Sequence, residues 1–419
     1  MINIEKFKLK NGLTVLFHKD ETTPIAVVNI LYNVGARDEK EDKTGFAHLF
    51  EHLMFGGSKN IENFDGPLQL AGGECNAFTN NDITNYYDTL PIQNIETAFW
   101  LESDRMLELA FTPKSLEVQR SVVIEEFKQR YLNQPYGDVW LLLRPLIYRT
   151  HPYKWATIGK TIAHIEEATM DDVRSFFFKY YCPDNAILVV GGNTDLETVR
   201  SLSEKWFGEI PSRGKNKRHL LPEPVQTEER ELTAERDVPS DAIYMAFRMG
   251  NRMSPEHYIG DLASDILARG KASRFHDQLI SEKKLFSSIS AYISGGWEDG
   301  LFVISGNLNT GVSFEIAKQE IWKELMFMAE TTLDQTELTK VKNKFKTSKV
   351  FSEQSLMNRV MNIAFFEMME KLDEIDSELE KYDTVSSQDI QDFAKRTFVK
   401  TNLSTLMIMS KKSDKISEQ

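Results

Sequence analysis

The chain has 419 residues, 41% hydrophobic and 27% charged, which is typical of a globular protein long enough for two domains. Its 63 acidic and 50 basic residues give a net charge of −13, which argues against a nucleic-acid partner because such a partner requires a basic face. The two cysteines, Cys75 and Cys182, are too few for a disulfide framework, and no run approaches the roughly 18 apolar residues of a membrane span. We therefore expect no membrane span, and a cytoplasmic chain, or a periplasmic one if an export signal has been removed.

Two strands are predicted near the start of the chain. Residues 13–17 follow the turn dipeptide Asn11-Gly12, and residues 25–32 form a second aliphatic run. A charged loop then leads into residues 45–55, which contain no proline. This segment therefore predicts a helix.

The predicted helix over 45–55 carries a His-x-x-Glu-His pattern. His48 and His52 are four residues apart, so a helix places them on one face, where two imidazoles can bind one divalent metal ion. Glu51 lies beside them and can act on a water bound to that metal. Such a pattern is expected by chance only about 0.02 times in this composition. Apolar neighbours also bury the helix, and buried imidazoles need partners or a metal.

A β-hairpin and several helices follow. Residues 72–79 and 83–90 predict the hairpin, because Asn80-Asn81-Asp82 between them has turn chemistry. Helical spacing and a later buried run predict four helices and one strand, at residues 94–109, 115–132, 137–148, 171–180 and 185–190.

A catalytic zinc ion needs a third protein ligand and one open position. The candidates are Glu125 and Glu126 on the predicted helix 115–132. Glu126 follows Val122 and Val123 by four and three residues, so it shares their side of the helix and is predicted to face inward. Glu125 is about 100° away and is expected to be exposed or to support the ligands. We select Glu126.

The second half of the sequence repeats the first. Between proline-containing residues 211–229, which we interpret as a linker, and the chain end, several features recur at an offset of 217 residues. We predict domains at 1–210 and 230–419. The same offset places residues 265–269, Asp-Ile-Leu-Ala-Arg, where the first copy has its metal motif. The second copy is therefore predicted to be structural or substrate-binding.

The chain resembles the inverted-motif zinc peptidases of the pitrilysin, insulin-degrading enzyme and mitochondrial processing peptidase family. It is similar to a small bacterial two-domain member. The similarity covers nearly the whole chain. Besides the metal motif it includes Asn11-Gly12-Leu13, Val34-Gly35-Ala36, Gly72-Gly73, Asn76-Ala77, Asp104-Arg105, His151-Pro152-Tyr153 and Asn185-Ala186.

The resemblance implies one zinc ion per chain, bound by His48, His52 and Glu126. It also implies that Glu51 is the general base. Many relatives have a second Glu seven residues before the metal-binding Glu, where this chain has Gln119. We expect Gln119 and Glu125 to support the ligands from outside the metal shell. Zinc itself is inferred from ligand type and family, since such ligands accept other divalent ions.

The resemblance further implies an α+β fold of two homologous domains, each an antiparallel sheet with helices packed on it. Two such pairs close around a chamber in the family, and extended peptides add as a strand to a sheet edge. The implied substrate-binding residues are Glu74, Asn76, Ala77, Phe78 and Arg274. Relatives often pair such an Arg with a Tyr, and that position here is Ser287.

The leading hypothesis is a zinc endopeptidase that cleaves extended peptides or small unfolded polypeptides with metal-activated water and Glu51 as general base. Because two domains make half of a four-domain chamber, we expect a dimer, either of identical chains or with a homologous subunit. Two alternatives stay open. One is a non-catalytic subunit of a larger complex, and the other is a metal hydrolase acting on something other than peptides.

Overall fold

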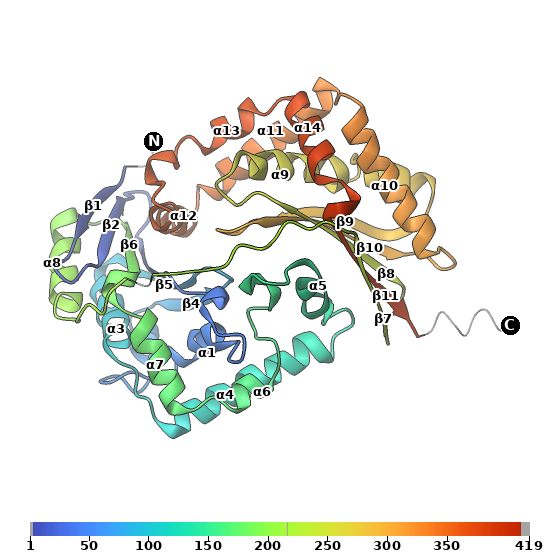
Figure 1. Cartoon of the computed structure of the whole chain (residues 1–419). Helices are drawn as coiled ribbons and strands as arrows, with labels where there is room; N and C mark the ends of the chain where they lie inside the picture. Colours follow the sequence, from blue (N-terminus) through green and yellow to red (C-terminus); the bar gives the residue numbers. More distant parts are fainter. Residues whose placement is uncertain (1–2, 216, 412–419) are drawn as a thin grey trace. The chain divides into compact units, whose positions relative to one another are not determined.

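The computed structural model describes residues 3–215 and 217–411, which form two compact units (Figure 1). Unit 1 contains Met1–Lys128, Trp155–Leu220 and Lys349–Asp376, and unit 2 contains Gln129–Lys154, Leu221–Ser348 and Ser377–Gln419. The predicted domains, 1–210 and 230–419, follow chain order, whereas these units exchange one segment in each direction. The predicted chain limits at 1 and 419, and residue 216 of the predicted linker, lie outside the described residues.

Unit 1 is built on a six-stranded sheet within the described residues. In spatial order its strands are β1 (Glu5–Lys8), β2 (Thr14–Lys19), β6 (Ala186–Gly192), β3 (Ile25–Tyr32), β5 (Thr84–Pro91) and β4 (Glu74–Thr79). All neighbours are antiparallel except β2 and β6, which are parallel. Its helices are α1 (Phe46–Leu53), α2 (Asp65–Leu70), α3 (Ile95–Leu107), α4 (Pro113–Phe127), α6 (Ala163–Glu166), α7 (Met170–Tyr180), α8 (Leu196–Phe207) and α12 (Leu356–Met368).

In the part of unit 2 that the structure describes, the sheet has five strands in the order β7 (Arg230–Arg236), β11 (Leu403–Ser410), β8 (Ala242–Met249), β10 (Gly300–Leu308) and β9 (Phe286–Ser294). Here too one pair, β7 and β11, is parallel. Its helices are α5 (Val139–Ile147), α9 (Pro255–Ala268), α10 (Phe314–Glu330), most of α11 (Gln335–Ser352), α13 (Glu378–Thr384) and α14 (Ser387–Thr397). The predicted α+β class is confirmed.

The predicted internal repeat is visible in matching elements. The bounds of β3 and β8 differ by 217 residues at both ends, and so do those of α7 and α14. Each of these two helices begins with the same capping box, in which a hydroxyl residue and an Asp three positions later satisfy each other's backbone N–H groups. Local sequence signals therefore build the same scaffold twice.

The exchanged segments cover the second face of each sheet. In unit 1, α12 comes from the second half of the sequence and packs on β6 and β3, close enough that a Cβ on Gly191 would contact Leu356 at 2.8 Å. In unit 2, α5 comes from the first half and packs on the face that carries Leu406 and Ile408 of β11. A sheet that is apolar on both faces needs a layer on each, and each repeat takes one layer from the other repeat.

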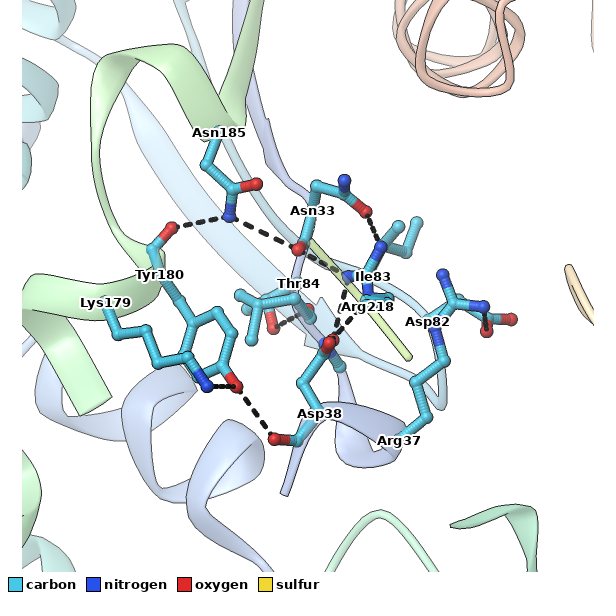
Figure 2. A network of polar contacts seen from close by, with 12 residues as sticks. Asn33, Arg37, Asp38, Asp82, Ile83, Thr84, Lys179, Tyr180, Asn185 and Arg218 are labelled. Carbon is cyan, nitrogen blue, oxygen red and sulfur yellow. Dashed lines mark hydrogen bonds and ion pairs between the residues drawn. The ribbon is translucent and has the colours of Figure 1, made fainter. Parts of the chain in front are cut away.

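The predicted linker, 211–229, makes polar contacts with unit 1 through Arg218 and with unit 2 through Glu223. In Figure 2, Arg218 reaches Asn33 and Asp38 in unit 1, with its guanidinium 2.5 and 2.8 Å from the two Asp38 carboxylate oxygens. In unit 2, the Glu223 carboxylate accepts hydrogen bonds from the N–H groups of residues 149–151. This segment is therefore held by specific polar contacts. Among the described residues, no helix has both the length and the apolarity needed to cross a membrane.

Candidate metal centre

The first turn of helix α1 is capped by Glu39, a residue outside the helix, because its N-cap residue Gly45 has no side chain that could do so. Gly45 precedes it in the left-handed conformation, with φ of +88°, which favours glycine. The N–H groups of Gly45 and Ala47 both donate to the carboxylate of Glu39, at 2.9 Å each. An acidic group at this place also complements the positive end of the helix dipole. Burial raises the pKa of Glu39 well above its ordinary value, and the two N–H donors oppose that rise.

The predicted ligands meet at one point. Nε2 of His48 lies 3.5 Å from Oε2 of Glu126, and Nε2 of His52 lies 3.3 Å from the same oxygen. One ligand atom from each residue lies within 4.8 Å of the other two. The two imidazole rings are one helical turn apart, with centroids separated by 4.9 Å. The structure therefore brings together two residues of α1 and one of α4.

These three residues fit a zinc ion. Two ligands of a tetrahedral zinc with bonds of about 2.05 Å are separated by about 3.3 Å, close to the two distances from Glu126 to the imidazole nitrogens. Two nitrogens and one oxygen are also the ligand atoms that zinc accepts in catalytic sites. Three protein ligands leave the fourth position open for water or substrate.

Glu51 occupies the turn of α1 between the two histidines. Its carboxyl is partly buried, and this desolvation raises its pKa above the ordinary value. The hydroxyl and N–H of Thr79, at the end of β4, donate to the carboxylate and lower the pKa in part. A carboxylate with raised proton affinity is better suited to accept a proton near neutral pH.

Helix α4 places Glu126 inward and Glu125 outward, as expected, but only one of the two valines used for that prediction is buried. Val123 is buried with 1% exposure, but Val122 is 44% exposed, so the expected inward stripe holds at only one of the two valines. Glu126 is partly buried, whereas Glu125 is exposed and bonds to Lys128 at 2.7 Å. Thr112 is the N-cap of α4, and Pro113 is its first residue.

Gln119 lies two helical turns before Glu126 on the same face of α4, close to the end of α1. Its Cγ would lie 3.7 Å from a Cβ on Gly56, and the Ser115 hydroxyl donates to the Gly56 carbonyl at 3.1 Å. The two helices are therefore held together near this point. Supporting roles for Gln119 and Glu125 remain predictions.

Strand β4 is an edge strand in the described part of the sheet, as a peptide-accepting strand must be. The predicted residues Glu74, Asn76 and Phe78 point to one exposed face, and Phe78 is 39% exposed. The N–H of Ala77 donates to the side chain of Asn76 at 2.8 Å. The tip of the hairpin is anchored by a buried ion pair between Arg37 and Asp82 at 3.1 Å, drawn in Figure 2.

Arg274 and Ser287 both have contacts within unit 2. Nε and Nη2 of Arg274 donate to the two carboxylate oxygens of Glu337 at 3.1 and 2.9 Å. The Ser287 hydroxyl lies 3.3 Å from the carbonyl of Asn307. A substrate-binding role of Arg274 remains a prediction, and it requires competition with Glu337.

The sequence did not reveal the groups that hold α1, the helix that carries His48 and His52 and is called the metal helix below. Glu39 lies within a run of seven charged residues, 37–43, in which nothing marks it as a helix cap. Thr79 reaches Glu51 only because β4 packs against α1. The resemblance that includes Asn76-Ala77 pointed to β4 as a substrate edge and not to its contact with the base.

Comparisons with known proteins agree with this site. The family model Insulinase (Peptidase family M16) matches residues 14–149, and Peptidase M16 inactive domain matches residues 167–345. The zinc protease PqqE of Helicobacter pylori is 29% identical over 81% of this chain and 77% of its own length. A solved structure of a protease from Helicobacter pylori has a TM-score of 0.93 and 26% identity, covering 97% of this chain and 99% of that one.

A solved structure of pitrilysin has the same fold with a TM-score of 0.79 and 17% identity; it covers 98% of this chain, which spans only 45% of the pitrilysin chain. The metal motif lies in the part that matches the insulinase model, and the second repeat falls largely in the part that matches the inactive domain. The fold, the paired models and the zinc protease relatives agree, and the chain belongs to the pitrilysin-like M16 family of metallopeptidases.

Proposed function

We propose that this protein is a zinc endopeptidase in which Glu51 is the general base for hydrolysis of a peptide bond. The observation that carries the proposal is the meeting of His48, His52 and Glu126 at distances suited to one zinc ion. Glu51 stands between the two histidines on the same helical turn. We propose one zinc ion per chain at this site.

A zinc ion at this site would polarise the substrate carbonyl and lower the pKa of a water molecule. In that chemistry Glu51 would accept a proton from the attacking water as the general base. The same carboxyl is placed to return the proton to the leaving amine. Thr79 limits the movement of the carboxylate through its two donor groups.

The proposed substrates are extended peptides or small unfolded polypeptides. The outer edge of β4 supports this, because no strand among the described residues pairs with it and its backbone groups there can bind a peptide strand without selecting its side chains. The N–H of Ala77 donates a hydrogen bond to the Asn76 side chain, which would have to move before a peptide carbonyl could accept from that N–H. A loose sequence preference follows from backbone pairing.

We propose that the active form is a dimer. The chain corresponds to about half of the pitrilysin chain, which supports assembly from two copies of this architecture. A homologous partner subunit and a second identical chain are both compatible with that length. The ion pair of Arg274 with Glu337 and the presence of Ser at position 287 favour a homologous partner, because this chain then has no uncommitted Arg and Tyr pair at these positions.

The test of the base is Glu51→Gln, with Glu117→Gln on the exposed side of α4 as the matched control. Glu51→Gln should retain its zinc but cleave a mixed peptide library about 10³-fold more slowly, because the amide cannot accept the proton. Glu117→Gln should match the parent. Unchanged cleavage by Glu51→Gln would refute the assignment. Mass measurement of the active species, with and without candidate subunits, tests the dimer.

A further inference from the structure

Arg105 carries a charge into the core of unit 1. It lies on α3 and has no exposed surface. Its guanidinium forms a two-pronged ion pair with the equally buried Glu102, with Nε at 2.9 Å from one oxygen and Nη2 on the other. A buried ion pair often contributes little to net stability, so stability alone does not account for this one.

The guanidinium of Arg105 is enclosed by aromatic rings. Its central carbon lies 4.3 Å from the centroid of the Tyr86 ring, 4.4 Å from that of Phe64 and 5.2 Å from that of Phe55. Phe55 lies two residues beyond the end of α1, and Tyr86 belongs to β5. A desolvated cation between rings attracts each of them, so Arg105 draws the end of the metal helix and the sheet together.

Tyr86 continues this connection to the metal helix itself. Its buried hydroxyl donates to the carbonyl of Phe50 at 3.1 Å. Phe50 immediately precedes Glu51 and lies between the two histidines of the motif. The carbonyl also accepts the helical bond from Met54 at 3.1 Å, so Tyr86 adds a lateral hydrogen bond at this turn of α1. Rotation of α1 about its axis would break that bond.

The preceding residue, Asp104, holds the chain just after α1. Its carboxylate accepts from the Ser58 hydroxyl at 2.5 Å and from the N–H and side chain of Asn60 at 3.0 and 2.6 Å. Consecutive residues of α3 therefore contact the segment that follows α1 in two ways. Arg105 contacts it through rings, and Asp104 contacts it through hydrogen bonds.

A second carboxyl lies in this cluster. Asp88 on β5 is fully buried beside Glu102 and Arg105, and desolvation together with the charge of Glu102 raises its pKa well above its ordinary value. This rise favours the uncharged form of the Asp88 carboxyl, which leaves Arg105 and Glu102 paired with each other.

We propose that Arg105 and Tyr86 are positioning residues that fix the rotation of α1 and so aim His48, Glu51 and His52 at one point. This inference rests on the proposed function, because the proposed function assigns those three residues their roles. It adds that their alignment depends on a buried cation on α3 that touches neither metal nor substrate. A group that sets ligand direction should affect zinc affinity and turnover more than peptide binding.

The sharpest variant is Tyr86→Phe, which removes only the hydroxyl on the Phe50 carbonyl. The matched control is Tyr180→Phe, since Tyr180 is also buried in unit 1 and donates to a backbone carbonyl, that of Asp38, at 2.9 Å (Figure 2). We expect Tyr86→Phe to lower kcat about 10-fold with KM within about twofold, and to weaken zinc binding about 10-fold in competition with a chelator. Tyr180→Phe should change neither value by more than about twofold.

Arg105 is tested together with its partner, because Arg105→Met alone leaves Glu102 buried and unpaired and can prevent folding. The double variant Glu102→Gln with Arg105→Met removes both charges. It should melt near the parent temperature, but bind Zn²⁺ about 10- to 100-fold more weakly. Parent-like zinc affinity in Tyr86→Phe and in a folded double variant would overturn the proposal. Equal losses in Tyr86→Phe and Tyr180→Phe would also overturn it.

Zinc affinity keeps this test separate from that of the proposed function. If Glu51→Gln cleaved peptides as fast as the parent, the role of the base would fail, but the metal titrations would still decide whether the cluster aligns the ligands. If Glu51→Gln were inactive while Tyr86→Phe behaved as the parent, the proposed function would stand and the positioning role would be wrong.

Discussion

The two repeats place different chemistry at the same two helical positions. His48 and His52 in α1 correspond, at an offset of 217 residues, to Asp265 and Arg269 at the end of α9. Arg269 lies 3.1 Å from Asp265, so opposite charges satisfy each other across one helical turn. Two imidazoles have no such attraction, but they offer two nitrogens to an ion. The same pair of helical positions therefore forms an ion pair in the second repeat and can bind a metal ion in the first.

The sheets differ in a similar way where the exchanged helices pack. Gly191 of β6 lies under α12, and its counterpart at the same offset is Ile408 of β11, which packs with α5. In unit 1 the helix side chains Leu356 and Val360 fill the space, and in unit 2 the strand side chain does. The same scaffold can therefore fill the space between strand and helix with side chains from either element, provided that the total side-chain volume is kept.

The largest expected effect comes from giving α1 the residues of α9. The double variant His48→Asp with His52→Arg should bind no zinc and cleave peptide at least about 10³-fold more slowly, because the ion has lost two of three ligands. Its metal-free form should melt within a few degrees of the metal-free parent, since the new pair is self-satisfying. Metal analysis, peptide assays and calorimetry measure these values. Zinc binding at the parent level would contradict the comparison.

Removing zinc with a chelator should affect the two repeats unequally. A ligand present at about 1,000 times its dissociation constant stabilises the folded state by about 4 kcal/mol, and that contribution would disappear only where the ion binds. Amide hydrogen exchange should therefore accelerate in α1 and α4 and stay unchanged in α9. Equal acceleration in both repeats would show that metal stabilises the chain as a whole.

Gly191→Ala tests the packing contrast. A Cβ at this position would contact Val360 and lie 2.8 Å from Leu356, so we expect a loss of about 1–3 kcal/mol in the free energy of unfolding from overpacking. Its counterpart control, Ile408→Val, removes one methylene and should cost about 0.5–1.5 kcal/mol. Urea unfolding compares the two. A parent-like stability for Gly191→Ala would mean that α12 can shift at no cost.

A pH effect should distinguish unit 2. Burial, aided by Arg252, lowers the pKa of His257 to about 3, against about 6.5 when unfolded. The unfolded state therefore binds the extra proton between these values, so stability is complete above pH 6.5 and falls as the pH drops toward 3. The expected loss is about 2 kcal/mol from pH 6.5 to 5. His257→Gln should reduce it, and His219→Gln, at an exposed position, should not.

Much of the scaffold could be predicted because its signals are local. The strand over residues 25–32 and the helix over 171–180 agree with β3 and α7 to within a residue, since their apolar spacing and caps lie within the elements themselves. The helix expected over 115–132 is less accurate, because α4 ends at Phe127 and a π-helical turn continues to Leu132. A change of helix type leaves no clear mark in the pattern.

Longer-range features were missed for a common reason. Strand β1 and helices α2, α6 and α8 were not predicted, and neither was the exchange of α5 and α12 between the sheets. These elements depend on which surfaces need cover after the strands have paired. The choice of Glu126 was made partly on an expected burial of Val122, which the structure does not support.

By itself the sequence determined the internal repeat and the pair of histidines on one helical turn, because both follow from spacing along the chain, whereas the α+β class came from the resemblance to a known family. Only the tertiary structure decided that Glu126 reaches that pair, that Glu39 caps α1, and that Arg105 and Tyr86 hold its orientation. These contacts join residues far apart in the chain, and no periodic pattern records them. They form when separate elements pack and leave buried polar groups that must find partners.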